Sequence, residues 1–164
     1  MLALSRLSPK DQLQVLLSAG QSIDLAPDDG TAAFERVRLR SLGVAAEITD
    51  AEGGGVTAET IAPLLGLTRE SVRRLRRRGQ LIAWRKGGQR FRYPVWQAYR
   101  GAILPGLSAV LSVLVARPTS PLAMADYFLS ESDELGGRRP LDLLRDKRVL
   151  EVLQHVQRYG VQGA

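Results

Sequence analysis

The chain has 164 residues, a formal net charge of +6 and no cysteine. Its length fits one domain or two small ones, and 45% apolar residues suffice for a hydrophobic core. The lack of cysteine excludes disulfides and thiolate zinc sites, which suits a reducing cytoplasm. Residues 104–116 form the longest apolar run, well short of the roughly 20 residues that span a bilayer. With no signal peptide recognisable at the N-terminus, we expect a cytoplasmic protein without a membrane contact.

Helix signals dominate the N-terminal part of the chain. Pro9 starts a predicted helix that Gly20 ends, and a second amphipathic helix is predicted over residues 31–42. Residues 50–55 (DAEGGG) predict a flexible linker. We therefore interpret residues 1–52 as a helical arm, with enough apolar surface to mediate dimerisation.

A strongly basic segment follows the predicted linker. Residues 69–92 contain ten basic side chains and one acidic side chain, Glu70. This segment carries +9, so the rest of the chain carries −3. One basic segment on a mildly acidic body indicates a localised anion-binding surface rather than general adhesion to polyanions.

The sequence from Thr57 to Gly79 is typical of a helix-turn-helix. Such a motif needs a small residue where the helices cross, a glycine in the turn and apolar residues on the buried faces. The residues that fill these positions are Ala62, Gly66, Ile61, Leu65, Leu67, Val72 and Leu75. Thr68 caps the second helix. Pro63, inside the first helix, predicts that this helix begins late or is kinked.

Two short strands, over residues 81–84 and 90–93, predict a hairpin that flanks the second helix. Because Val72 and Leu75 are expected to face inward, the outward positions are those of Arg69, Glu70, Arg73, Arg74 and Arg77. Arginine can pair with guanine in the major groove, while a hairpin tip contacts phosphates or the minor groove. The predicted DNA-binding residues are Thr68, Arg69, Ser71, Arg73, Arg74, Arg77, Lys86, Gln89 and Arg90. Trp84, Phe91 and Tyr93 are expected to anchor the hairpin to the helices.

The stretch VTAETIAPLLGLTRESVRRLRRRGQLIAWRKGGQRFRYP resembles the winged helix-turn-helix of the excisionase and MerR-like group. The resemblance implies binding to operator or attachment-site double-stranded DNA by residues 53–100. Operators are usually palindromic, so we expect a homodimer. The residues themselves leave open a second interpretation, in which the arginines form only a solvated helix face.

Helix signals continue to the end of the chain, and we interpret residues 101–164 as a C-terminal helical module. Helices are expected near residues 95–101 and 105–115, after Ser120 and Pro121, and in a last helical region that ends at Tyr159. The predicted fold is therefore mainly α, with a central winged helix-turn-helix, one short β-hairpin and this helical module.

The sequence LGGRRP (residues 135–140) and the leucine-rich helices after it resemble the toxin-binding domain of the Xre/MbcA/ParS antitoxin family. The resemblance implies neutralisation of a RES-domain toxin, which consumes NAD, and repression of the protein's own operon. By position it places toxin contact at Gly136, Gly137, Arg138, Arg139, Pro140, Arg158, Tyr159 and Gly160. The alternatives are a turn without a partner and an excisionase-like or solitary regulator without a toxin.

No enzymatic site is recognisable in the sequence. His155 is the sole histidine, and we expect it on the helix surface. The adjacent acidic residues Asp28 and Asp29 have no second cluster at metal-ligand spacing. Because no phosphate loop or nucleophile–base pair occurs either, we expect neither catalysis nor a cofactor.

Overall fold

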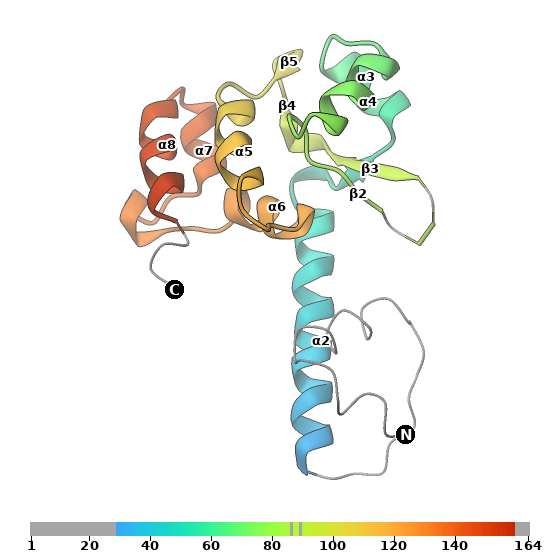
Figure 1. The fold of residues 1–164 in the computed structure, drawn as a ribbon, viewed down its shortest axis with the longest axis vertical. Helices are drawn as coiled ribbons and strands as arrows, with labels where there is room; N and C mark the ends of the chain where they lie inside the picture. Colours follow the sequence, from blue (N-terminus) through green and yellow to red (C-terminus); the bar gives the residue numbers. More distant parts are fainter. Residues whose placement is uncertain (1–28, 86, 89, 160–164) are drawn as a thin grey trace. The chain divides into compact units, whose positions relative to one another are not determined.

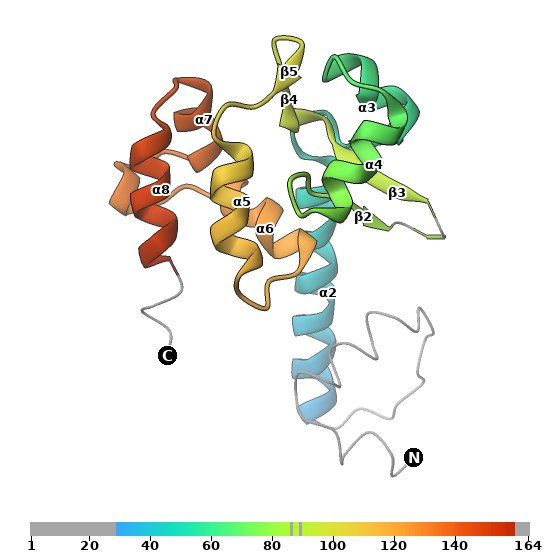
Figure 2. The ribbon, with the colours of Figure 1, turned by 45° about the horizontal axis from the view of Figure 1, so that its top comes forward.

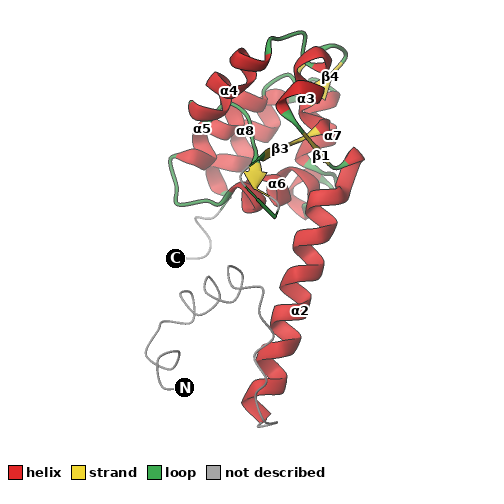
Figure 3. Cartoon of the chain, turned by 90° about the vertical axis from the view of Figure 1, so that its right-hand side faces the viewer, coloured by secondary structure: helices red, strands yellow, loops and turns green. Residues whose placement is uncertain are grey.

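The computed structural model describes residues 29–85, 87–88 and 90–159 (Figure 1). These residues form seven α-helices and small antiparallel sheets, which confirms the predicted mainly helical fold (Figure 3). The helix predicted from Pro9 lies outside the described residues, as do Lys86, Gln89 and Gly160. The chain divides into two compact units, residues 1–46 and residues 47–164.

Helix α2 (Asp29–Asp50) is longer than the helix predicted over residues 31–42. The predicted end at Gly43 is wrong, because Gly43 does not adopt the left-handed conformation with which glycine ends helices. Leu39, Leu42 and Val44 of this helix are exposed.

The segment predicted as a flexible linker has a defined structure. A 3-10 turn (Ala51–Gly53) leads into strand β1 (Gly55–Val56), which pairs antiparallel with strand β3 (Phe91–Pro94). The Glu52 carboxylate forms ion pairs of 2.9 Å with both Arg139 and Arg145. The linker prediction is therefore wrong: residues far away in the sequence hold this segment in place.

The helix-turn-helix consists of α3 (Ala58–Leu64) and α4 (Arg69–Arg77), capped by the Thr57 and Thr68 hydroxyls. Gly66 turns the chain between them with a φ of 65°, and a Cβ added there would lie 2.9 Å from a backbone oxygen of Gly101. A glycine is required at this position for both reasons. Pro63 lies in the last turn of α3, where the helix continues for one residue only.

The wing is a three-stranded sheet in the order β1-β3-β2, in which β2 spans Trp84–Arg85. Trp84 lies opposite Arg92, and Arg85 lies opposite Phe91. The predicted hairpin is confirmed, whereas its third strand was not predicted. Trp84 and Tyr93 are buried, which confirms that they anchor the wing.

The helix predicted over residues 95–101 does not form. A 3-10 turn (Val95–Gln97) and a small hairpin of β4 (Ala98–Tyr99) and β5 (Ala102–Ile103) replace it. The reason is the buried Gln97 side chain, whose Oε1 accepts a 2.6 Å hydrogen bond from the Ile82 amide while its Nε2 donates one of 2.9 Å to the Ile82 carbonyl. This pairing with a distant segment outweighs local helix propensity.

The C-terminal part contains α5 (Leu107–Val115), α6 (Pro121–Leu129), α7 (Pro140–Arg145) and α8 (Val149–Arg158), as predicted. A 3-10 turn (Asp133–Leu135) precedes α7. Helix α8 packs against α5 and α7 (Figure 2). Buried side chains of these helices and of the winged helix-turn-helix belong to one core cluster. The domain limits predicted near residues 52 and 100 stay a prediction.

Candidate nucleic-acid interface

Helix α4 presents an arginine-rich face to solvent. Val72 is fully buried and Leu75 partly buried, which fixes the rotation of the helix against the core. Its other side is lined by exposed side chains, namely those of Arg69, Glu70, Arg73, Arg74 and Arg77. The outward orientation predicted for these residues is confirmed, whereas Arg76 of the same helix is partly buried.

The first turn of α4 is organised by two hydroxyl groups. Thr68 Oγ1 accepts a 3.1 Å hydrogen bond from the Ser71 amide and donates one of 2.9 Å to Ser71 Oγ. Ser71 Oγ also accepts a 3.3 Å hydrogen bond from Arg74. Thr68 and Ser71, both predicted as DNA contacts, therefore act in the free protein as the helix cap and as a support for Arg74.

Two carboxylates hold part of the arginine face. Glu59 of α3 accepts a 3.2 Å hydrogen bond from Arg69 and lies 4.0 Å from Arg73. Glu70 accepts one of 3.0 Å from Arg77, two turns further along α4. Hydrogen bonds from its own backbone amide, from Thr57 and from Arg69 lower the pKa of Glu59. The hydrogen bond from Arg77 lowers the pKa of Glu70, so both groups are anionic at neutral pH.

The Phe91 ring of the wing contacts two arginines, one of which, Arg76, belongs to α4. The Arg76 guanidinium carbon lies 3.9 Å from the Phe91 ring centroid, and that of Arg85 lies 4.7 Å from it. The buried Arg76 Nε has no hydrogen-bond partner within the described part of the chain. Arg76 therefore holds the wing strand β3 against α4 through a cation–π contact. The sequence did not predict this role, although position 76 lies one turn after the buried Val72.

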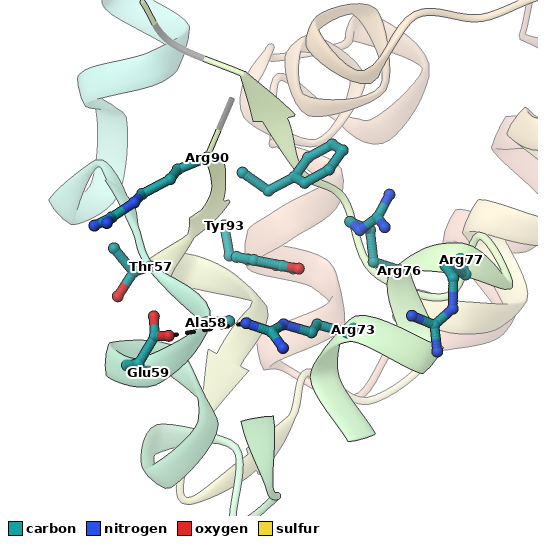
Figure 4. A pocket seen from close by; sticks show the side chains of 9 residues that line it. Thr57, Ala58, Glu59, Arg73, Arg76, Arg77, Arg90 and Tyr93 are labelled. Carbon is teal, nitrogen blue, oxygen red and sulfur yellow. Dashed lines mark ion pairs between the residues drawn. The ribbon is translucent and has the colours of Figure 1, made fainter. Parts of the chain in front are cut away.

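A cleft of about 590 Å³ lies between the two helices and the wing (Figure 4). Its walls carry four arginines and one carboxylate. The lining residues are Thr57, Ala58, Glu59, Arg73, Arg76, Arg77, Arg90, Phe91 and Tyr93. Of the predicted DNA-binding residues, the structure brings Arg73, Arg77 and Arg90 together around this cleft, whereas Arg69 and Arg74 lie on α4 outside its lining. Lys86 and Gln89 lie outside the described residues.

The described residues predicted to contact a toxin divide into buried or ion-paired side chains and exposed ones. Gly136 and Gly137 form an exposed left-handed turn, and Pro140 is buried at the start of α7. Arg138 pairs with Asp146, and Arg139 with Asp142 at 2.7 Å and with Glu52. Arg158 lies 3.8 Å from Glu134. Arg138 and Arg139 are therefore engaged in internal ion pairs, whereas the Gly136–Gly137 turn, Arg158 and Tyr159 are exposed.

His155 is buried, which corrects its predicted surface position. Its Nδ1 lies 2.9 Å from the Tyr127 hydroxyl and its Nε2 lies 3.1 Å from the Ser132 hydroxyl. Burial lowers the pKa of His155 below the usual 6.5. The prediction failed because the loop that covers one side of α8 is contributed by residues before α7.

The described residues contain no group of three or more side chains that could hold a metal ion. Among the helices of this same part of the chain, none has the length and apolar character needed to cross a membrane.

Comparison with known proteins identifies a fold but no family. No protein-family model matches the chain, and no curated protein matches it in sequence. The solved structure described as "NMR structure of Rv2175c" is similar, with a TM-score of 0.54 and 22% sequence identity. The similarity covers 66% of this chain and 82% of that chain. The chain thus shares the mainly helical fold of Rv2175c.

Proposed function

We propose that this protein binds double-stranded DNA through α4 and the wing. The observation that carries the proposal is the exposed arginine face of a capped helix, next to a hairpin that carries Arg90. The major groove admits an α-helix, and arginine side chains can bind guanine there in a bidentate manner. The wing then lies along the neighbouring backbone.

A selection from random duplexes tests this function directly. The full chain should enrich a defined sequence, and its affinity for that duplex should fall linearly in a plot of log K against log salt. The absence of binding to any duplex at low ionic strength would contradict the proposal.

We further propose that the target is the operator of the protein's own gene and that a homodimer binds it. A two-fold protein matches a palindromic operator, and one helix-turn-helix alone provides little specificity. The exposed Leu39, Leu42 and Val44 on α2 supply apolar surface for such a dimer. Light scattering of the full chain measures its mass, and a monomer at every concentration would contradict dimerisation.

We also propose that the protein is an antitoxin whose C-terminal module neutralises a RES-domain toxin. Its support is the sequence resemblance of residues 135–140 and the helices after them, together with the exposed Gly136–Gly137 turn. The proposal includes no reaction and no cofactor, and it places the protein in the cytoplasm. Co-expression with the toxin tests it: growth should be restored by the full chain.

The alternative is an excisionase-like or solitary regulator of a mobile element. The exposed arginine face of α4 supports this alternative as well, because a protein can bind DNA through it without any toxin partner. The neighbouring reading frame distinguishes the two proposals: a small RES-like protein favours the antitoxin, and an integrase favours the regulator.

A further inference from the structure

The cleft beside α4 gathers positive charge from two elements. Arg73 and Arg77 reach it from α4, and Arg90 reaches it from the wing (Figure 4). The side chains of Arg73 and Arg77 are about half exposed, at 45% and 55%. Guanidinium groups on separate walls of an open cleft suit an extended polyanion, because each can bind a different phosphate.

The aromatic residues of the cleft do not offer a stacking surface to a base. Tyr93 is buried, and the Phe91 ring already lies against the guanidinium groups of Arg76 and Arg85. Proteins that bind single-stranded nucleic acid do so by stacking its bases on aromatic rings that are free to receive them. The chemistry of the cleft therefore favours the sugar–phosphate backbone of a duplex.

Glu59 is the one carboxylate in this lining, and it is paired with arginines that face the cleft and the start of α4. It lies 3.2 Å from Arg69 and 4.0 Å from Arg73, and its side chain and that of Arg69 are both 57% exposed. Ion pairs this exposed are weak, so another anion can replace the carboxylate. A backbone phosphate presents the same charge and more acceptor atoms.

We propose that the cleft seats the phosphate backbone of one DNA strand, and that a phosphate displaces Glu59 from Arg69 and Arg73. Glu59 is then a built-in competitor that lowers the affinity of this surface for DNA. The inference rests on the proposed DNA-binding function and adds to it the residue that sets how tightly the backbone is held.

The test is Glu59→Gln, which keeps the shape of the side chain and removes its charge. Binding of the full chain to a labelled random-sequence duplex and to the selected duplex is measured by fluorescence anisotropy. The variant should bind both about two- to fivefold more tightly, the equivalent of one exposed ion pair. Glu59→Asp keeps the charge and should show no such gain. Circular dichroism melting of each variant reports whether the fold is retained.

A matched control separates this local effect from net charge. Glu134 is an exposed carboxylate that lies 3.8 Å from Arg158, so Glu134→Gln makes the same charge change away from α4. It should leave the affinity for DNA nearly unchanged. Adding Glu59→Gln to an Arg69→Gln and Arg73→Gln background should give no gain, since the competing pair is already absent.

Three results would overturn the inference while the DNA-binding function stands: an affinity in Glu59→Gln that is equal to that of Glu134→Gln, a weaker affinity, or a gain that persists without Arg69 and Arg73. A folded wild-type protein that binds no duplex would instead refute the proposed function, and the inference with it.

Discussion

The rings of Trp96 and Phe128 lie 5.3 Å apart between centroids, with a 43° angle between their planes. Trp96 lies in the 3-10 turn that follows the wing and Phe128 lies in α6, so this contact joins the winged helix-turn-helix to the C-terminal helices. Both side chains are buried in the shared core.

Phe128→Ala should therefore destabilise residues 47–164 as a whole. Truncation of a buried phenylalanine costs about 3–5 kcal/mol of the free energy of unfolding, through lost burial and the cavity left behind. Urea denaturation should show one transition, followed equally by tryptophan fluorescence and by circular dichroism. If the two signals separate in the wild type, the two parts do not unfold together.

Arg73→Ala with Arg74→Ala should weaken binding to the selected duplex by about 1–3 kcal/mol for each lost base contact. Both side chains are exposed, so the melting temperature should change little. A gel-shift titration measures the loss. Arg148→Ala serves as the control, because it removes an exposed arginine that is paired with Glu151 in the C-terminal module. An undiminished affinity of the double variant would reject these arginines as DNA contacts.

Arg76→Lys should weaken DNA binding through the position of the wing. Lysine keeps the charge but loses the flat guanidinium that lies 3.9 Å from the Phe91 centroid, a contact worth about 0.5–1 kcal/mol. Anisotropy titration should show roughly a two- to fivefold loss of affinity with the helical content unchanged. Arg78→Lys changes an exposed neighbour in the same way and should have no effect. Equal losses in both variants would argue against a positioning role for Arg76.

Stability should decrease as the pH falls through the range in which His155 protonates in the unfolded chain. Burial lowers the pKa of His155 in the folded protein below its usual 6.5. As the pH falls, the unfolded state consequently binds the proton first. The stabilising contribution of neutral His155 is present above pH 6.5, and it is lost as the pH falls from 6.5 to the lower pKa of the folded protein. Urea denaturation at pH 7.5 and at pH 5.5 measures the difference. His155→Gln should reduce this dependence, and an unchanged dependence in the variant would assign it to other groups.

Deletion of the chain after Tyr159 should spare DNA binding. Arg117 donates hydrogen bonds to the backbone carbonyls of Gln157 and Tyr159, so the end of α8 stays held when the last residues are removed. On the antitoxin proposal, the truncated protein should fail to restore growth when it is co-expressed with the toxin. Full rescue by the truncated form would show that residues 160–164 are not the inhibitory element.

The candidate interface could be predicted in part, because its local features follow from neighbouring residues. Thr68 begins α4 with a hydroxyl cap, and Gly66 and Gly79 take left-handed conformations around that helix. Spacing alone placed Val72 inward and four arginines of α4 outward, while the inward contact of Arg76 with Phe91 was not predicted. The pairing of Glu59 with Arg69 could not be predicted, because it depends on how α3 crosses α4.

By itself, the sequence determined the elements whose signals are local: the capped helices α3, α4 and α6, the wing hairpin and the concentration of positive charge on one helix. Only the tertiary structure decided which distant residues meet. It paired β1 with β3, brought Glu52 to Arg139 and enclosed His155 between Tyr127 and Ser132. Caps and periodicity arise within a few residues, whereas burial and ion pairing depend on the assembled core, which overrode the helix predicted over residues 95–101 and the linker predicted over residues 50–55.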